Sequence, residues 1–199
     1  MEKRAFERIC VFCGSSVGLR KQYEDAAKSM AEELARREID LTYGGGSVGL
    51  MGVIADEMLR LGREVIGIIP QAIASREVAH HYLTELRVVR SMHERKSLMA
   101  ELSDAFIALP GGYGTYEELF EVITWSQLGI HQKPIGILNV AGYFDPMLDL
   151  VERGIEEEFI RPQYRDLILV SENPEDLLDR METFEPIQGV TKWIDLVKS

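Results

Sequence analysis

The chain has 199 residues, of which 46% are hydrophobic and 28% are charged, and its formal net charge is −11 at pH 7. This length and composition predict one globular domain and exclude a disordered or fibrous protein. The acidic charge argues against a protein that binds nucleic acid, because such a protein needs Lys and Arg to replace the counterions of the phosphate backbone.

Apolar runs alternate with segments of helical periodicity along the chain. In chain order, the runs at 9–12, 40–43, 65–70, 86–89, 105–109, 135–139 and 167–170 predict strands, and the periodic segments at 22–37, 48–61, 92–102, 116–128, 146–158 and 174–184 predict helices. Residues 106–109 and 135–138 are apolar throughout, which is typical of strands covered on both faces. The order predicts an α/β, Rossmann-like fold with a doubly wound, mostly parallel sheet and helices on both faces.

Two stretches fall outside this alternation. Residues 71–82 are polar and contain paired histidines, and we expect a loop or short helix over the sheet edge, near the active face if Pro70 ends a strand. Residues 185–189 break the last helix. We therefore expect one nucleotide-binding domain over residues 1–184 and a tail over residues 185–199, in which Trp193 is the only large anchor.

Cys10 and Cys13 are the only cysteines, and they lie in or just after the first strand, not at the start of a helix, where a redox pair has a lowered pKa. No second pair is present to complete a zinc site. We expect two small buried thiols and no metal. The chain has no run of about 18 apolar residues and no signal region at its start, so we expect no membrane contact and a cytoplasmic location.

A first glycine-rich turn follows the second predicted strand and contains Gly44, Gly45, Gly46 and Gly49. In open α/β sheets, ligands bind beyond the carboxyl ends of the strands, and glycines let the backbone approach a ligand closely. The spacing also matches a dinucleotide motif, but Pro70 stands where the acid that binds ribose should follow. A nicotinamide or flavin cofactor is therefore not expected. A tight turn that packs a helix on a strand, without a ligand, stays the alternative.

A second turn contains Gly111, Gly112, Tyr113, Gly114 and Thr115, ahead of the predicted helix at 116–128. Its amide groups and the threonine hydroxyl can hold a phosphate at the start of a helix. The next residues are acidic, Glu117 and Glu118, in what we predict to be the first helical turn, where the helix dipole favours carboxylates. A carboxylate and a phosphate charge about 6 Å apart repel by roughly 3 kcal/mol at an effective dielectric near 20, so a phosphate here needs a cation.

Arg95, with Lys96 beside it, is the candidate cation. The segment follows the strand predicted at 86–89, which should place it on the same sheet edge as the glycine turns. Arginine offers a planar fork that suits a phosphate or the edge of a purine. The alternative is a solvated helix face bearing Glu94, Arg95 and Lys96.

Three ordered motifs, at 44–52, 92–96 and 110–118, resemble the Lonely Guy family of cytokinin riboside 5′-monophosphate phosphoribohydrolases, long mislabelled as lysine decarboxylases. The resemblance runs from about Ile9 to Phe184. It implies a Rossmann-like enzyme without a cofactor that releases adenine, or an N6-modified adenine, and ribose 5-phosphate from the nucleoside 5′-monophosphate. It also implies a homodimer or larger assembly with sites completed near the subunit interface, and we expect the apolar faces around Met51, Met58 and Trp125 to serve that assembly.

The resemblance also assigns site residues. It implies that Arg95 and Glu118 are the catalytic pair. The implied substrate contacts are Glu77, Lys96, Gly111, Gly112, Tyr113, Gly114, Thr115, Glu117 and Thr124. From the first glycine turn itself we expect substrate contact by Gly44, Gly45 and Gly46. Breaking the N-glycosidic bond develops positive charge on the sugar and negative charge on the base, which a carboxylate and an arginine stabilise respectively.

Two other functions are weighed against this one. A lysine decarboxylase needs pyridoxal phosphate on a lysine, and no cofactor pattern accompanies Lys96. A nucleotide carrier or sensor, such as a molybdenum cofactor carrier, could use the same fold. The pairing of Glu118 with Arg95 favours the enzyme, because a binder gains nothing from a carboxylate beside a phosphate. AMP, dAMP and cytokinin monophosphates all remain possible substrates.

Overall fold

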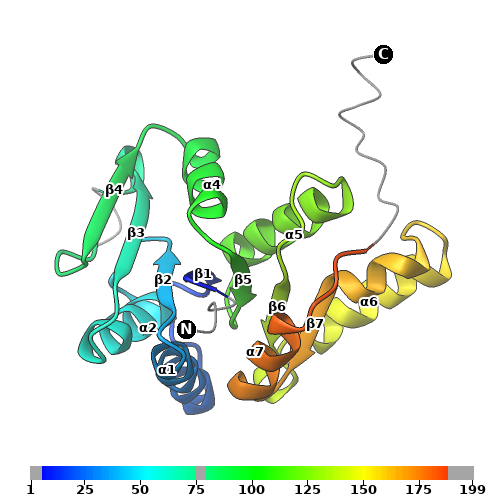
Figure 1. Ribbon diagram of the computed structural model, residues 1–199, viewed down its shortest axis with the longest axis horizontal. Helices are drawn as coiled ribbons and strands as arrows, with labels where there is room; N and C mark the ends of the chain where they lie inside the picture. The colour runs from blue at the N-terminus through cyan, green and yellow to red at the C-terminus, as the bar shows by residue number, and fades with distance from the viewer. Residues whose placement is uncertain (1–5, 75–78, 188–199) are drawn as a thin grey trace, which may run out of the picture.

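The computed structural model describes residues 6–74 and 79–187. Within these residues one seven-stranded sheet has the order β4-β3-β2-β1-β5-β6-β7, and every neighbouring pair is parallel (Figure 1). The strands are β1 (Arg8–Phe12), β2 (Asp40–Tyr43), β3 (Val65–Pro70), β4 (Glu85–Val89), β5 (Ala105–Ala108), β6 (Ile135–Leu138) and β7 (Ile168–Ser171). The predicted parallel sheet is confirmed.

Helices cover both faces of the sheet. The α-helices are α1 (Lys21–Arg36), α2 (Gly49–Arg60), α3 (Gln71–Ala74), α4 (Met92–Glu101), α5 (Tyr113–Gln127), α6 (Asp145–Glu156) and α7 (Pro174–Glu182), and two 3₁₀ turns are η1 (Val140–Gly142) and η2 (Pro162–Leu167). Figure 1 shows α1, α2 and α7 on one side and α4 and α5 on the other. Two hydrophobic clusters fill the two interfaces, as expected for strands that are apolar on both faces.

The chain reverses its direction across the sheet at β1. From β1 it runs outward through β2, β3 and β4, and it then returns to β5 on the other side of β1. The loops that follow β1 and β5 therefore meet at one edge. There Gly14 N–H donates to Pro110 O over 3.0 Å, and Met51 N–H donates to Gly14 O over 3.3 Å. These bonds join the loops after β1 and β5 to the first turn of α2, at the position where open α/β sheets bind ligands.

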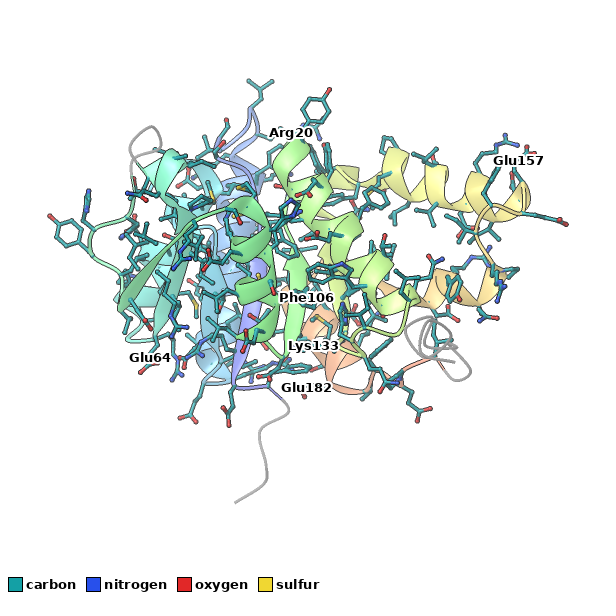
Figure 2. The ribbon with its side chains drawn as sticks, turned by 90° about the horizontal axis from the view of Figure 1, so that it is seen from above. Arg20, Glu64, Phe106, Lys133, Glu157 and Glu182 are labelled. Atoms are coloured by element: carbon teal, nitrogen blue, oxygen red, sulfur yellow. The ribbon has the colours of Figure 1, made fainter. Side chains whose placement is uncertain are left out.

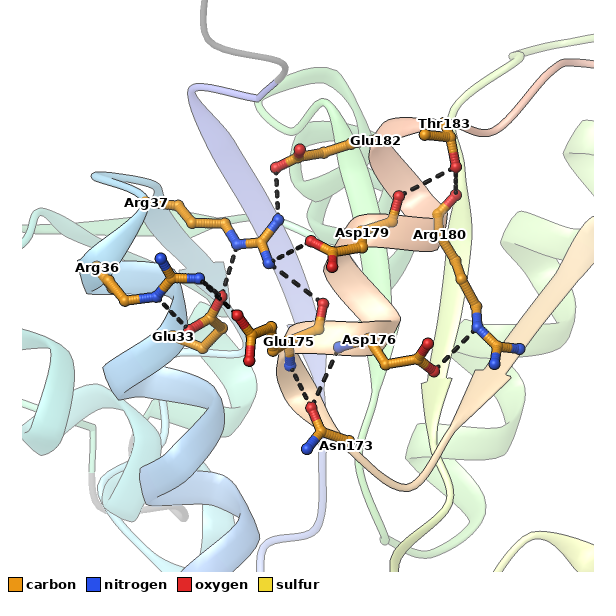
Figure 3. Close-up of polar contacts among 10 residues, drawn as sticks. All are labelled: Glu33, Arg36, Arg37, Asn173, Glu175, Asp176, Asp179, Arg180, Glu182 and Thr183. Atoms are coloured by element: carbon orange, nitrogen blue, oxygen red, sulfur yellow. Dashed lines mark hydrogen bonds and ion pairs between the residues drawn. The ribbon is translucent and has the colours of Figure 1, made fainter.

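The carboxyl ends of the strands and their amino ends lie on opposite sides of the molecule. In Figure 2, Arg20 lies at the carboxyl-end edge, whereas Glu64 and Glu182 lie at the opposite edge. At that opposite edge the Arg37 guanidinium joins α1 to α7 (Figure 3). It donates to carboxylates of Glu33, Asp179 and Glu182 over 2.7, 2.7 and 2.8 Å, and to Glu175 O over 3.2 Å. This cluster links α1 to α7 at the ends of the strands opposite to the ligand-binding loops.

The predicted start of the helix at 116–128, which is α5 in the structure, was wrong. The helix begins at Tyr113, three residues before the predicted start, because Gly112 is already the extended residue that precedes it. Glu117 and Glu118 therefore lie beyond the first turn, which contains no acidic residue. The helix dipole acts mainly within the first turn, so it does not account for these two carboxylates.

The sequence argument for assembly was also wrong in part. Met51 is 8% exposed and Met58 is 0% exposed, and both belong to the core between α2 and the sheet. Neither side chain is available to another subunit. Trp125 is partly buried against the second cluster.

The structure also bears on the predictions for the cysteines, for the segment after Pro70 and for membrane contact. Cys10 and Cys13 are buried free thiols, as predicted. Gln71–Ala74 forms the short helix expected after Pro70, but residues 75–78, including Glu77, and most of the tail, including Trp193, lie outside the described residues. None of the described helices is long and apolar enough to cross a membrane. The cytoplasmic location stays a prediction.

Candidate active site

The start of α4 aims Arg95 at the sheet. Ser91 precedes the helix, and its hydroxyl accepts the N–H of Glu94 over 3.1 Å, while the Glu94 carboxylate accepts the N–H of Arg90 over 2.8 Å. This reciprocal capping fixes the first turn. Arg95 lies one residue further on, and its Nε donates to Ile68 O in β3 over 3.0 Å. The local sequence thus anchors the guanidinium above the carboxyl ends of the strands.

Arg95 faces Glu118 of α5. Arg95 Nη1 lies 3.2 Å from Glu118 Oε1, and the two side chains are only 13% and 10% exposed. The predicted catalytic residues, 23 positions apart in the sequence, are therefore brought together by two helices on the same face of the sheet. A charge pair shielded from water interacts more strongly than one on the surface.

The surroundings of Glu118 disfavour its charge. Burial raises the pKa of the Glu118 carboxyl, Arg95 lowers it in part, and the neighbouring Glu117 raises it further. Burial, together with the nearby Glu118 charge, also raises the pKa of both Cys10 and Cys13, so the thiols stay protonated. A carboxylate that is poorly hydrated and held by one arginine is well suited to stabilise a positive charge that forms beside it.

The Lys96 ammonium forms ion pairs with two acidic side chains of α5. Its ammonium contacts Glu117 and lies 2.9 Å from Glu121 Oε1, and its side chain is 10% exposed. Burial lowers the pKa of Lys96, but the hydrogen bonds to Glu117 and Glu121 outweigh it, so the net pKa is raised. Sequence reasoning missed Glu121, although its spacing from Glu117 along a helix places both on one face. Lys96 therefore balances acidic side chains of α5.

The second glycine turn combines a buried base with an exposed rim. A Cβ atom on Gly111 would lie 2.1 Å from Thr115 Oγ1 and 2.8 Å from Gly14 N, so only glycine fits. Thr115 is 3% exposed and packs beneath the turn. Gly112, Tyr113 and Gly114 are exposed at the start of α5. Amide groups in a first helical turn have no partner within the helix, so this rim can receive an anion.

A cavity of about 310 Å³ adjoins this rim, at the point where β1 and β5 meet. It is lined by Gly14, Ser15, Ser16, Val17, Gly18, Tyr23, Leu50, Pro110, Gly111, Gly112 and Tyr143. Sequence reasoning missed the loop after β1 and both tyrosines. The signal for the loop was present, because Gly14-Ser15-Ser16 directly follows the first strand.

Tyr143 holds the peptide group at the centre of this rim. Its hydroxyl donates to Gly111 O and lies 2.5 Å from the Tyr116 hydroxyl. Since the Tyr143 proton is used on the carbonyl, Tyr116 is the donor in the second bond. Burial, followed by the hydrogen bond with Tyr116, raises the pKa of Tyr143 to about 12.

The first glycine turn is closely packed. Gly44 lies against the Arg95 guanidinium. Gly45 O accepts the N–H of His80 over 3.0 Å, and Gly46 O accepts the Tyr43 hydroxyl over 3.1 Å. All three glycines are buried. Substrate contact by Gly45 and Gly46 stays a prediction.

Two predicted contacts remain, Thr124 and Glu77. Thr124 is exposed on α5, and its hydroxyl donates to Phe120 O over 2.7 Å. It is therefore open to a ligand but is not part of the Arg95 and Glu118 cluster. Glu77 is outside the described residues. Across the described part of the chain, no group of His, Cys, Asp and Glu is arranged to hold a metal ion.

Comparison with known proteins identifies close relatives. The family model described as "Possible lysine decarboxylase" matches residues 51–181. The chain is 53% identical to the probable cytokinin riboside 5′-monophosphate phosphoribohydrolase LOGL6 of Oryza sativa, over 91% of this chain and 72% of that protein. It is 52% identical to cytokinin riboside 5′-monophosphate phosphoribohydrolase LOG3 of Arabidopsis thaliana, over 94% of this chain and 86% of that protein.

Solved structures show the same fold at much lower identity. The molybdenum cofactor binding protein of Rippkaea orientalis is 18% identical, with a TM-score of 0.65 over 92% of this chain and 98% of that one. The molybdenum cofactor carrier protein of Chlamydomonas reinhardtii is 17% identical, with a TM-score of 0.64 over 86% of this chain and 94% of that one. At such identities the likeness concerns the fold alone.

Proposed function

We infer, since this chain belongs to the family of cytokinin riboside 5′-monophosphate phosphoribohydrolases, that it is an enzyme that hydrolyses the N-glycosidic bond of a purine nucleoside 5′-monophosphate. The substrate is AMP or an N6-modified AMP such as a cytokinin riboside monophosphate. The products are the free base and ribose 5-phosphate. The observation that carries this proposal is the buried pair of Arg95 and Glu118 above the strand ends.

The pair supplies the two charges that the reaction needs. When the bond between C1′ and the base nitrogen breaks, its electrons leave with the base and the sugar becomes cationic. The Glu118 carboxylate stabilises the sugar cation, and the Arg95 guanidinium stabilises the negative charge on the base. Water then supplies a hydroxyl to C1′ and a proton to the base. Because both side chains are largely buried, little solvent weakens these interactions.

We place the phosphate at the exposed rim of α5, beside the cavity, and not on Lys96. Three carboxylates, Glu117, Glu118 and Glu121, already face Arg95 and Lys96. A phosphate added among them would meet an excess of negative charge. The amide groups of Gly112, Tyr113 and Gly114 offer partners without that repulsion. In this arrangement the phosphate anchors the substrate and brings C1′ to Glu118.

A carrier function has weaker support. The solved molybdenum cofactor proteins share the fold at 17–18% identity, whereas the phosphoribohydrolases share about half of all residues. A carrier also has no use for a buried carboxylate opposite an arginine. Catalysis accounts for the cost of burying Glu118, and binding alone does not.

The test is a substrate panel. Purified protein is incubated with nucleoside mono-, di- and triphosphates and with nucleosides, and free base is measured by chromatography. We expect base release from AMP or N6-modified AMP and at least a hundredfold lower kcat/KM for adenosine. Binding of nucleotides without any base release would favour a carrier. Equal cleavage of AMP and adenosine would contradict the proposal that the phosphate anchors the substrate.

We further propose a homodimer or larger assembly. Phe120, within α5, and Ile130, just after it, are 39% and 50% exposed. Exposed apolar side chains of this size favour a protein interface when they cluster. Light scattering after size-exclusion chromatography at micromolar concentration should give at least twice the monomer mass of 22.6 kDa. A monomer mass would contradict the assembly.

A further inference from the structure

Each nitrogen of the Arg95 guanidinium has a different neighbour. Nε donates to Ile68 O over 3.0 Å, and Nη1 lies 3.2 Å from Glu118 Oε1 and 3.9 Å from Met92 Sδ. Nη2 occupies the space beside Gly44, where a Cβ atom would be only 2.2 Å away. The last contact therefore depends on the absence of a side chain at the end of β2.

The backbone does not require glycine at this position. Gly45 and Gly49 have φ values of 76° and 64°, in the left-handed region that favours glycine, whereas Gly44 is not among the residues with positive φ. The other close neighbours of a Cβ at Gly44 are Met51 Sδ at 3.3 Å and Arg95 Cζ at 3.4 Å. An alanine would thus meet one severe obstacle, and that obstacle is the mobile end of the Arg95 side chain.

We propose that Gly44 is a positioning residue for Arg95, and that its missing side chain provides the slot that holds the guanidinium plane toward Glu118. The sequence assigned Gly44 to direct contact with the nucleotide; the geometry assigns it to the arginine. The kinetic consequences of this proposal rest on the proposed hydrolysis, but its geometric part does not.

A methyl group in the slot would displace the charge without removing it. Since Cβ and Nη2 cannot remain 2.2 Å apart, the guanidinium must rotate or withdraw. The bond from Nε to Ile68 O and the contact of Nη1 with Glu118 share the same rigid plane, so both change together. Displacement of a catalytic group by about 1 Å can lower turnover by about a hundredfold.

The first test compares Gly44→Ala with Gly136→Ala. A Cβ on Gly136 would also be crowded, at 2.7 Å from Met181 Sδ, but it lies in β6 against α7 and not in the site. We expect kcat for AMP to fall at least tenfold in Gly44→Ala, with the acid limb of the kcat profile moved to higher pH, because Glu118 loses part of its counter-charge. Gly136→Ala should keep kcat within about twofold per folded protein. Equal loss in both variants would overturn the proposal.

A double-mutant cycle separates positioning from general damage. In an Arg95→Ala background, Gly44→Ala should change kcat by less than about twofold, since no guanidinium remains to be displaced. A further tenfold loss there would show that Gly44 acts through something else and would overturn the proposal. If Gly44→Ala alone does not fold, folding restored by Arg95→Lys would support the same coupling, and failure to restore it would contradict the coupling.

A spectroscopic readout is independent of turnover. The Nε–Hε NMR signal of Arg95, assigned by its loss in Arg95→Ala, should shift and exchange faster in Gly44→Ala, because the bond to Ile68 O is broken. An unchanged signal would overturn the positioning role whatever the kinetics. If the wild-type protein releases no base, the proposed function fails, and this signal still decides the role of Gly44.

Discussion

Glu118 of α5 lies 3.2 Å from Arg95 of α4, and burial of this pair sets the charge state of the carboxylate. Burial raises the pKa of Glu118, and Arg95 offsets the rise only in part. The carboxyl therefore keeps its proton to a higher pH than an exposed glutamate, whose pKa is about 4.3. If Glu118 is the catalytic carboxylate, turnover should depend on pH through this residue.

The first prediction is that kcat falls at acid pH. If the ionised carboxylate is required, kcat should fall as the pH drops through the raised pKa of Glu118, so the loss should begin at a higher pH than for a solvated glutamate. The parameter to follow is kcat, since the substrate phosphate itself titrates near pH 6 and affects binding. A kcat that stays constant down to pH 4.5 would contradict the role of Glu118.

The second prediction concerns Tyr143. Its hydroxyl holds Gly111 O, and in a trans peptide the N–H of Gly112 then points the opposite way, toward the proposed phosphate site. Tyr143→Phe should raise KM for AMP by about three- to tenfold, the equivalent of one hydrogen bond, and change kcat less. Tyr116→Phe removes only the outer bond and should have the smaller effect. A larger effect from Tyr116→Phe would exclude this arrangement.

The third prediction concerns stability at the opposite edge of the sheet. Arg37→Ala removes the bonds that join α1 to α7 (Figure 3), and we expect it to lower the free energy of unfolding by about 1–3 kcal/mol. The matched control is Arg36→Ala, whose side chain is 59% exposed and which should cost less than about 0.5 kcal/mol. Urea unfolding measures both. Similar losses in the two variants would show that burial of Arg37 is unimportant.

Neither variant should affect catalysis. Arg37 follows the end of α1, at the edge of the sheet opposite to the glycine turns, so the Arg95 and Glu118 pair stays intact. We expect kcat for AMP to stay within about twofold of wild type below the unfolding temperature. A large loss of kcat in Arg37→Ala would show that α1 and α7 are coupled to the site.

The fold was predicted from local patterns, and the central pair was implied by the family resemblance of three ordered motifs. Apolar runs and glycine turns place Arg95 and Glu118 at the same edge of a parallel sheet. The start of α5 was missed, because Tyr113 and Gly114 resemble a loop until Gly112 is seen to precede a helical turn. Met58 was misassigned because an apolar helical residue has the same pattern whether the sheet or another subunit covers it.

Three other contacts between distant segments could not be predicted. Tyr143 reaches Gly111 from the segment after β6, and Lys96 pairs with Glu121 across two helices. Gly44 was identified as important for a turn, but its neighbour Arg95 is 51 residues away in the sequence. Such contacts depend on how helices pack, which spacing along the chain does not specify.

The central claim is that Glu118 acts on the reaction and not on binding. Glu118→Gln keeps the shape and removes the charge, so kcat for AMP should fall by at least about a hundredfold. Binding of the phosphate should hold, because the proposed phosphate site at the rim of α5 does not include Glu118. Arg95→Ala should lose both turnover and binding. Glu117→Gln is the matched control, since that side chain is 54% exposed, and its kcat should fall much less.

The most direct measurement determines kcat for AMP and, by calorimetry, the Kd for ribose 5-phosphate, a product that the wild-type enzyme cannot consume. For Glu118→Gln we predict that kcat falls by two orders of magnitude or more while Kd is unchanged. Near-normal kcat in Glu118→Gln, or an equal loss of kcat and of product affinity, would contradict the assignment of Glu118 as the catalytic carboxylate.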